Sequence, residues 1–201
     1  MALRKSFLIT CLSFLVVSCG QPAGDDEIEL PDGISSTQHR IFVTSVDYDG
    51  NLGGLSGADS KCQELAEAAG LEKTYKALLS SSSVDAKDHL ALTGSIVAID
   101  SDDSQIVIAS TTENFWSVTS SNNLVAKINV DENGQVRTGQ TPWTGSSSSG
   151  EGSLNFCSDW ASNDSVNEGD FGSTDSLDAT WVENNFEDCN NLNPLFCVSV
   201  D

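Results

Sequence analysis

Positive charge is scarce in this chain of 201 residues, which has nine Lys and Arg against thirty Asp and Glu. The formal net charge is −21, and residues 138–201 carry eleven acids and no Lys or Arg. Nucleic acids and anionic lipid surfaces are bound through clustered Lys and Arg, so both are excluded as main partners of a folded surface. The length predicts one domain with short extensions, and 38% hydrophobic residues with 16 Gly are typical of a polar globular protein.

The apolar segment at the N-terminus is short. Residues 7–17 form a run of 11 residues behind Arg4 and Lys5, whereas a transmembrane helix needs about 20. This pattern is typical of a signal peptide. The run ends in Val16-Val17-Ser18-Cys19, which resembles the bacterial lipobox. The resemblance implies cleavage before Cys19 and acylation of Cys19 with fatty acids such as palmitate; the alternative is an ordinary secretory signal with an incidental Cys.

A polar, acidic stretch follows the predicted cleavage site. Positions 20–38 contain three Gly, two Pro, five acids and no base, and such a segment buries too little apolar surface to fold alone. We therefore predict a signal peptide at 1–18, an acylated Cys with a flexible tether at 19–38, and one domain at 39–201. Residue 21 is Gln rather than the Asp that retains some lipoproteins in the inner membrane, which favours the outer membrane of a bacterial cell envelope.

Residues 39–201 alternate between helical and extended patterns, which predicts an α+β domain. Cys62, Leu65, Ala66 and Ala69 fall on one face of a helix that ends near Ala69, with Ser56 or Gly57 as its cap. A second helix is predicted at 83–92. Asp131-Glu132-Asn133-Gly134 predicts a hairpin turn. Further extended segments are predicted at 41–45, 75–79, 96–99, 105–109 and 195–200.

Four cysteines lie in the predicted domain: Cys62, Cys157, Cys189 and Cys197. An even number in an exported protein argues for disulfides, but four cysteines allow three pairings and spacing alone does not choose among them. Zinc is the other hypothesis. It is disfavoured because no Cys-x₂₋₄-Cys pair is present and both histidines, His39 and His89, lie far from any Cys in sequence.

Several blocks of the domain resemble endostatin, the C-terminal domain of certain collagens, and a group of bacterial lipoproteins with an endostatin-like domain. The resemblance implies a C-type-lectin-like fold with two helices, a twisted antiparallel sheet and paired first and last strands. It also implies the disulfides Cys62–Cys197 and Cys157–Cys189. The blocks, in the same order, are GADSKC at 57–62, AGL at 69–71, TYKA at 74–77, LSS at 79–81, Trp143-x-Gly145, Cys157-x-x-Trp160, Cys189 and Phe196-Cys197.

The chain departs from endostatin at two functional features. The N-terminal zinc-binding histidines of endostatin are not matched, with only His39 nearby, and its arginine-rich heparin-binding surface is missing from this acidic chain. Neither property is carried over.

Catalytic motifs are missing from the sequence. Gly145–Gly150 is predicted to be a flexible Ser/Gly run without the Gly-x-Ser-x-Gly pattern, and no spacing pairs His89 with a Ser. We therefore predict no enzyme activity. Calcium is a more plausible cofactor than zinc, since Asp, Glu and Asn supply the oxygen ligands that Ca²⁺ prefers. The lectin motifs Glu-Pro-Asn and Trp-Asn-Asp are absent, so a solvated acidic surface is favoured. The weak candidates are Glu183, Asn184, Glu187 and Asp188.

The sequence predicts a membrane-anchored, extracytoplasmic lipoprotein with a non-catalytic binding or adhesion domain. Its partners would be the membrane, through the lipid anchor, and a glycan or protein ligand. The alternatives are an enzyme acting on envelope glycan and a structural envelope protein. Trp160 and Trp181, beside cysteines, are expected in the core rather than at a sugar site. A shallow exposed loop surface would favour binding; a deep cleft with buried acids or a His–Ser contact would favour an enzyme.

Overall fold

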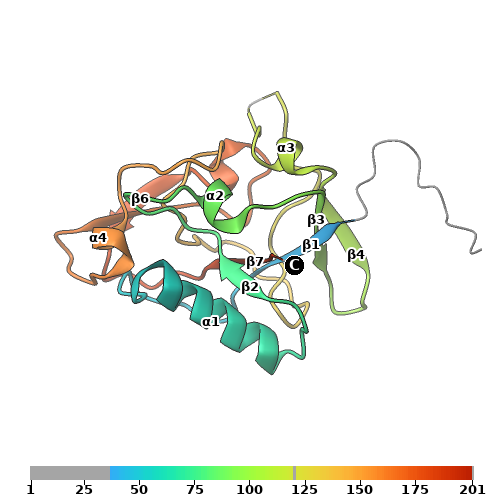
Figure 1. Cartoon of the computed structure of the whole chain (residues 1–201), viewed down its shortest axis with the longest axis horizontal. Helices are drawn as coiled ribbons and strands as arrows, with labels where there is room; N and C mark the ends of the chain where they lie inside the picture. The colour runs from blue at the N-terminus through green and yellow to red at the C-terminus, as the bar shows by residue number, and fades with distance from the viewer. Residues whose placement is uncertain (1–36, 120, 201) are drawn as a thin grey trace, which may run out of the picture. The chain divides into compact units, whose positions relative to one another are not determined.

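A five-stranded sheet organises residues 37–119 and 121–200, the part of the chain that this computed structural model describes (Figure 1). Its strand order is β2-β7-β1-β3-β4, and β5 and β6 form a separate two-stranded sheet. The predicted signal peptide, Cys19 and nearly all of the tether lie outside the described residues. The elements are β1 (Gln38–Val43), α1 (Gly54–Ala68), β2 (Tyr75–Ala77), α2 (Ala86–Leu90), β3 (Ser95–Ile99), β4 (Gln105–Ala109), α3 (Thr112–Phe115), α4 (Cys157–Trp160), β5 (Glu168–Phe171), the 3₁₀ turn η1 (Ala179–Trp181), β6 (Asn185–Asp188) and β7 (Phe196–Ser199).

The first and last strands pair in the middle of the sheet. β1 and β7 run antiparallel, with Phe42 opposite Cys197. Ile41 and Val43 belong to one hydrophobic cluster and Phe42 to the other, and all three are buried. Because side chains alternate across a strand, this continuous apolar run covers both faces of the sheet. The α+β class with paired terminal strands is therefore present.

The sheet is mixed, which corrects the prediction of a wholly antiparallel one. β1 and β3 are parallel, with His39 opposite Ile96. A parallel neighbour requires a crossover connection, and the segment between β1 and β3, which holds α1, β2 and α2, provides it. Periodicity predicts the strands but not their directions. The two predicted helices are present, and the single turns α3 and α4 are additional.

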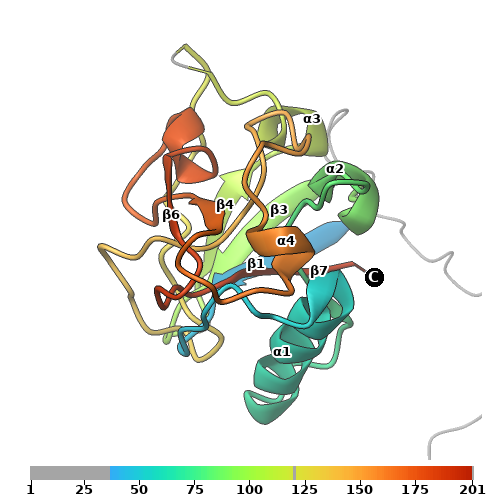
Figure 2. The same cartoon turned by 90° about the vertical axis from the view of Figure 1, so that its left-hand side faces the viewer.

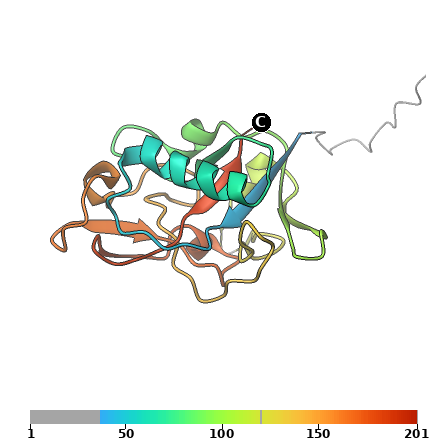
Figure 3. The same cartoon turned by 90° about the horizontal axis from the view of Figure 1, so that it is seen from below.

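Helix α1 packs along the sheet and contributes a stripe of small residues (Figure 3). Ala58, Cys62 and Ala66 are fully buried, and they recur every four residues on one face. The helix begins at Gly54, earlier than the predicted Ser56 or Gly57 cap, because Gly53 takes up the left-handed conformation at the N-cap. Gly70, also left-handed, follows its end.

Two other predicted elements differ from the structure in their extent. Helix α2 is shorter than 83–92, and its N-cap is Asp85. The predicted hairpin at 131–134 is a tight turn closed by one bridge, Val130 to Val136. None of the helices in the described ranges is long and apolar enough to cross a membrane.

The last third of the described chain forms the loop-rich end of this folded unit. α4 and the β5–β6 sheet lie at the end opposite to the β3–β4 hairpin (Figures 1 and 2). β1 starts, and β7 finishes, away from α4.

Candidate functional site

Two disulfides hold the fold, with the pairing implied by the resemblance. Cys62 in α1 bonds to Cys197 in β7, and Cys157 at the start of α4 bonds to Cys189 after β6, with Cα–Cα distances of 5.5 and 5.6 Å. All four cysteines are buried. The second bridge joins two segments 32 residues apart, the start of α4 and the residue after β6. It therefore holds two parts of the loop-rich end together.

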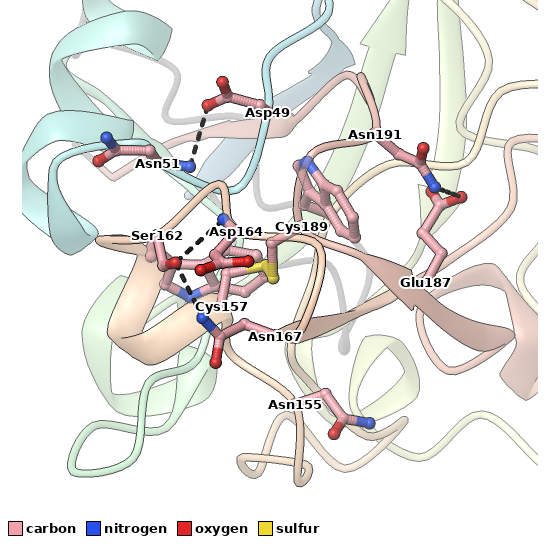
Figure 4. The surroundings of a disulfide bond; sticks show 12 residues. Asp49, Asn51, Asn155, Cys157, Ser162, Asp164, Asn167, Glu187, Cys189 and Asn191 are labelled. Carbon is pink, nitrogen blue, oxygen red and sulfur yellow. Dashed lines mark hydrogen bonds between the residues drawn. A yellow bond between two sulfur atoms is a disulfide. The ribbon is translucent and has the colours of Figure 1, made fainter.

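Backbone packs closely around the second disulfide. A Cβ on Gly169 would lie 2.7 Å from Cys157 Sγ, and Gly50 would clash with the same disulfide. Polar side chains surround it (Figure 4): the Ser162 hydroxyl accepts hydrogen bonds from the Asp164 amide, at 3.1 Å, and from the Asn167 side-chain amide, at 2.9 Å. The bridge is enclosed by backbone and then by a hydrogen-bonded polar shell.

α4 is a left-handed turn made of four residues that are not glycine. The φ angles of Cys157, Ser158, Asp159 and Trp160 are 47°, 56°, 57° and 62°. Left-handed backbone costs an L-residue roughly 1–2 kcal/mol, and such conformations persist only where the surroundings enforce them.

Contacts at both ends of this turn enforce it. The disulfide holds Cys157. Trp160 is fully buried and donates from its indole N–H to the carbonyl of Ser80 at 2.7 Å. The Asp159 carboxylate accepts hydrogen bonds from the Ser82 amide and hydroxyl at 2.7 and 2.9 Å. The strained turn is thereby locked to the 80–82 segment.

Adjacent open depressions lie beside this turn, and we call the surface that they form together with the β5–β6 ladder the loop face: residues 152–156, 166–170 and 183–188. One, of about 360 Å³, is lined by Leu154, Val166 and Glu168 among others. A second, of about 600 Å³, is lined by Leu154, Asp170 and Phe186 among others. Leu154 is 91% exposed, Val166 81% and Phe186 50%. A surface that combines exposed apolar side chains with polar ones is typical of an interaction site.

The loop face is negatively charged. In the β5–β6 ladder Glu168 lies directly opposite Asp188, and Asp170 lies opposite Phe186. Like charges opposite one another on a sheet are destabilising, and neither Glu168 nor Asp188 has an ion pair among the described residues.

The Lys and Arg side chains of residues 37–119 and 121–200 lie outside the loop face, and each contacts another group of the fold. The hydrogen bond that Lys87 donates to the Glu151 carboxylate raises the pKa of Lys87. The contacts are Arg40 with the Glu132 carbonyl, Lys61 over the Tyr48 ring, Lys73 with the Gln38 carbonyl, Lys76 with the His89 carbonyl, Lys87 with Glu151, Lys127 with Asp175 and Arg137 with Asp47.

The four weak calcium candidates do not converge. The Glu183 carboxylate accepts a hydrogen bond from the Ser148 backbone N–H at 3.2 Å. The backbone N–H of Asn184 donates to the Phe171 carbonyl at 2.9 Å. Glu187 is held by the side-chain amides of Asn191 and Asn193, while its neighbour Asp188 points to the other face of β6. Within the described ranges no three His, Cys, Asp or Glu side chains are grouped to hold a metal.

Both histidines are engaged by groups of the fold. The ring nitrogens of His39, which is 2% exposed, lie 2.6 and 2.8 Å from the carbonyls of Ser199 and Thr93. His89 Nε2 lies 2.9 Å from the carboxylate of Asp59, which also accepts the Ala77 amide. These contacts join β1 to β7 and to the loop before β3, and α2 to α1, so they account for both side chains structurally.

Two expectations about the last third have clear outcomes. Trp160 and Trp181 are fully buried, which confirms their place in the core. The Ser/Gly run is packed: Ser146 is fully buried, and its hydroxyl bonds to Ser80 and to the Thr144 carbonyl.

Sequence analysis missed the loop face. The sequence contains one signal for it, namely single apolar residues inside polar segments, Ser153-Leu154-Asn155 and Ser165-Val166-Asn167. The left-handed turn has no such signal, because none of its four residues favours that conformation.

Comparison with known families gives one match. A family model described as "Protein of unknown function (DUF1554)" matches residues 45–177, about two thirds of the chain. No curated protein matches. The matched region runs from the end of β1 through β5 and includes α4 and most of the loop face.

Proposed function

We propose that this chain, which belongs to the DUF1554 family, whose description names no activity, is a lipid-anchored, extracytoplasmic binding domain. It holds its ligand on the loop face without catalysis. The observation that carries this proposal is the group of exposed apolar side chains, Leu154, Val166 and Phe186, around open depressions. Monomeric proteins keep such groups on their surfaces mainly where they meet a partner.

The proposal includes an endostatin-like, C-type-lectin-like domain. The two disulfide pairings and the antiparallel pairing of β1 with β7 support it. The resemblance implies that a long loop before the last cysteines binds the ligand, as it does in many C-type lectins. Here the loops of that region build the loop face and are fastened by the Cys157–Cys189 bridge.

The position of the loops fits an anchored binding domain. The tether would join the folded unit just before β1, and β1 starts away from α4 (Figures 1 and 3). The predicted anchor is acylated Cys19, in the outer membrane of a bacterial envelope, and stable anchoring needs more than one acyl chain.

The test is a binding screen with a matched pair of variants. The full chain, a Leu154→Ser/Val166→Ser variant and a Val125→Ser/Val136→Ser control are screened on a glycan array, with and without Ca²⁺, and on immobilised extracellular proteins. Val125 and Val136 are 65% and 66% exposed and lie outside the loop face. We expect the wild type and the control to retain at least one ligand that the loop-face variant loses.

Two results would contradict the proposal. One is a loop-face variant that retains every ligand of the wild type. The other is turnover of a glycan on the array, which would identify an enzyme.

A further inference from the structure

Three exposed apolar residues of the loop face, Val166, Leu154 and Phe186, line two depressions that share Leu154, and we call these three residues the strip. Leu154 lines both the depression of about 360 Å³ that contains Val166 and the depression of about 600 Å³ that contains Phe186. A ligand that covers Leu154 therefore reaches both neighbours. This continuity suits a linear ligand better than one compact group.

The strip lies beside a strand with an open edge. β6 pairs with β5, and no other strand of the described residues pairs with it. Three of its four residues are exposed. The Asp188 carbonyl already accepts the Asn191 backbone N–H, so the exposed face of the ladder, rather than this edge, is the surface available to a ligand.

The charge on the same side of the ladder is negative. Glu168, Asp170, Phe186 and Asp188 project from one face, because directly opposed residues share a face and alternate residues return to it. Glu168 and Asp188 face one another without an intramolecular cation. A ligand with a positive side chain here would relieve that repulsion.

We propose that the loop face binds an extended polypeptide segment of a partner protein that carries both apolar residues and Lys or Arg on one side. The segment lies across the exposed face of the β5–β6 ladder, where its apolar side chains cover Leu154 and Phe186 and its cationic ones lie against Glu168 and Asp188. This rests on the proposed function and specifies its partner.

Other occupants fit the charge less well. A sulfated glycan or an anionic lipid would be repelled by the acids of the face. A second copy of the chain would place Glu168 and Asp188 against the acids of its partner. A neutral glycan would leave the Glu168–Asp188 repulsion uncompensated.

Fluorescence anisotropy with defined peptides tests the proposal on the full chain, purified as the cell processes it and kept in mild detergent. The labelled probes are peptides with Lys-Lys-Val-Val, Thr-Thr-Val-Val and Glu-Glu-Val-Val repeats, which we call the Lys-Val, Thr-Val and Glu-Val peptides; when extended, each presents both of its residue types on each side. Binding is measured at about 10 mM and about 1 M NaCl, where the Debye length is about 30 Å and about 3 Å. We expect the Lys-Val peptide to bind most tightly, with an affinity that falls at high salt.

Matched variants locate the site. Glu168→Gln/Asp188→Asn should weaken Lys-Val binding about tenfold at low salt and remove most of the salt dependence. Phe186→Ala should weaken it about tenfold at both salt concentrations. The controls, Glu72→Gln/Asp102→Asn and Val125→Ala, change exposed residues outside the loop face and should bind as the wild type does. All these positions are solvent-exposed, so the variants should fold.

The outcomes separate this proposal from the proposed function. If the Lys-Val peptide fails to bind, or the loop-face variants bind it as well as the controls do, the cationic segment is refuted. Should the earlier screen then still yield a glycan lost by the loop-face variant, the proposed function stands alone. Dimerisation abolished by Phe186→Ala would assign the face to a second copy and overturn the proposal. If neither screen nor peptide gives a ligand, both proposals fall.

Discussion

Replacing Ser158 with Gly should stabilise the protein, although Gly destabilises most positions. Ser158 has φ 56° and ψ 55°, where an L-residue loses roughly 1–2 kcal/mol relative to right-handed backbone. Gly adopts this conformation freely. The Ser158 side chain is exposed and makes no hydrogen bond among the described residues, so the substitution removes no hydrogen bond.

The magnitude follows from two opposed effects. Relief of the left-handed conformation contributes about 1–2 kcal/mol, and the larger entropy of Gly in the unfolded chain removes about 0.4–1 kcal/mol. We expect a net gain of about 0.5–1 kcal/mol. For a domain of this size that corresponds to about 1–4 °C in Tm.

The assay is urea unfolding with both disulfides intact, followed by tryptophan fluorescence, because Trp143, Trp160 and Trp181 are fully buried. Ser60→Gly is the matched control. It makes the same chemical change inside α1, where the helical backbone should make it destabilising by about 0.5 kcal/mol. If Ser158→Gly lowers the free energy of unfolding as Ser60→Gly does, the left-handed turn is not strained as described.

Four further predictions concern the bridges, the anchor, one carboxylate and calcium. Chain entropy predicts that Cys62→Ala/Cys197→Ala lowers the free energy of unfolding by roughly 5 kcal/mol and Cys157→Ala/Cys189→Ala by roughly 3.7 kcal/mol; denaturant titration measures both, and the reverse order would contradict the loop-length argument. Cys19→Ala should move the protein from the membrane to the soluble fraction; a variant still membrane-bound and labelled by palmitate would refute the lipobox. Hydrogen bonds from Thr180 and Ser176 lower the pKa of Asp178 below its usual 3.8. The ionised carboxylate therefore stabilises the fold at neutral pH, and this stabilisation is lost as the pH falls through the lowered pKa. Asp178→Ala should lower Tm at pH 7, and a Tm difference that persisted at pH 2 would contradict this cause. CaCl₂ and NaCl at matched ionic strength should shift Tm equally, whereas a Ca²⁺-specific rise reversed by EDTA would reveal a metal site.

Sequence periodicity was sufficient for most of the sheet and for α1. Strands such as Gln105–Ala109 and the stripe containing Cys62 and Ala66 are local patterns of apolar residues, so they are visible in the sequence. The parallel direction of β3 is not local, because it depends on where the crossover returns the chain. The cysteine pairing was available only from the family resemblance, since spacing allows three arrangements.

The loop face was beyond sequence reasoning for a physical reason. Leu154 and Phe186 look like ordinary loop and strand residues, and only the fold shows that one is 91% and the other 50% exposed beside a common depression. The acids were visible in the sequence, but the opposition of Glu168 to Asp188 depends on the register of two strands.

The central position of β7 sets the order in which this protein can acquire its structure. β7 lies between β2 and β1, and its Cys197 bonds to Cys62, 135 residues earlier. The sheet cannot close until the final residues of the chain have arrived. We therefore expect a chain that still lacks β7 to have neither the closed sheet nor the Cys62–Cys197 bond. In the export route proposed above, the sheet would form only after β7 has crossed the membrane.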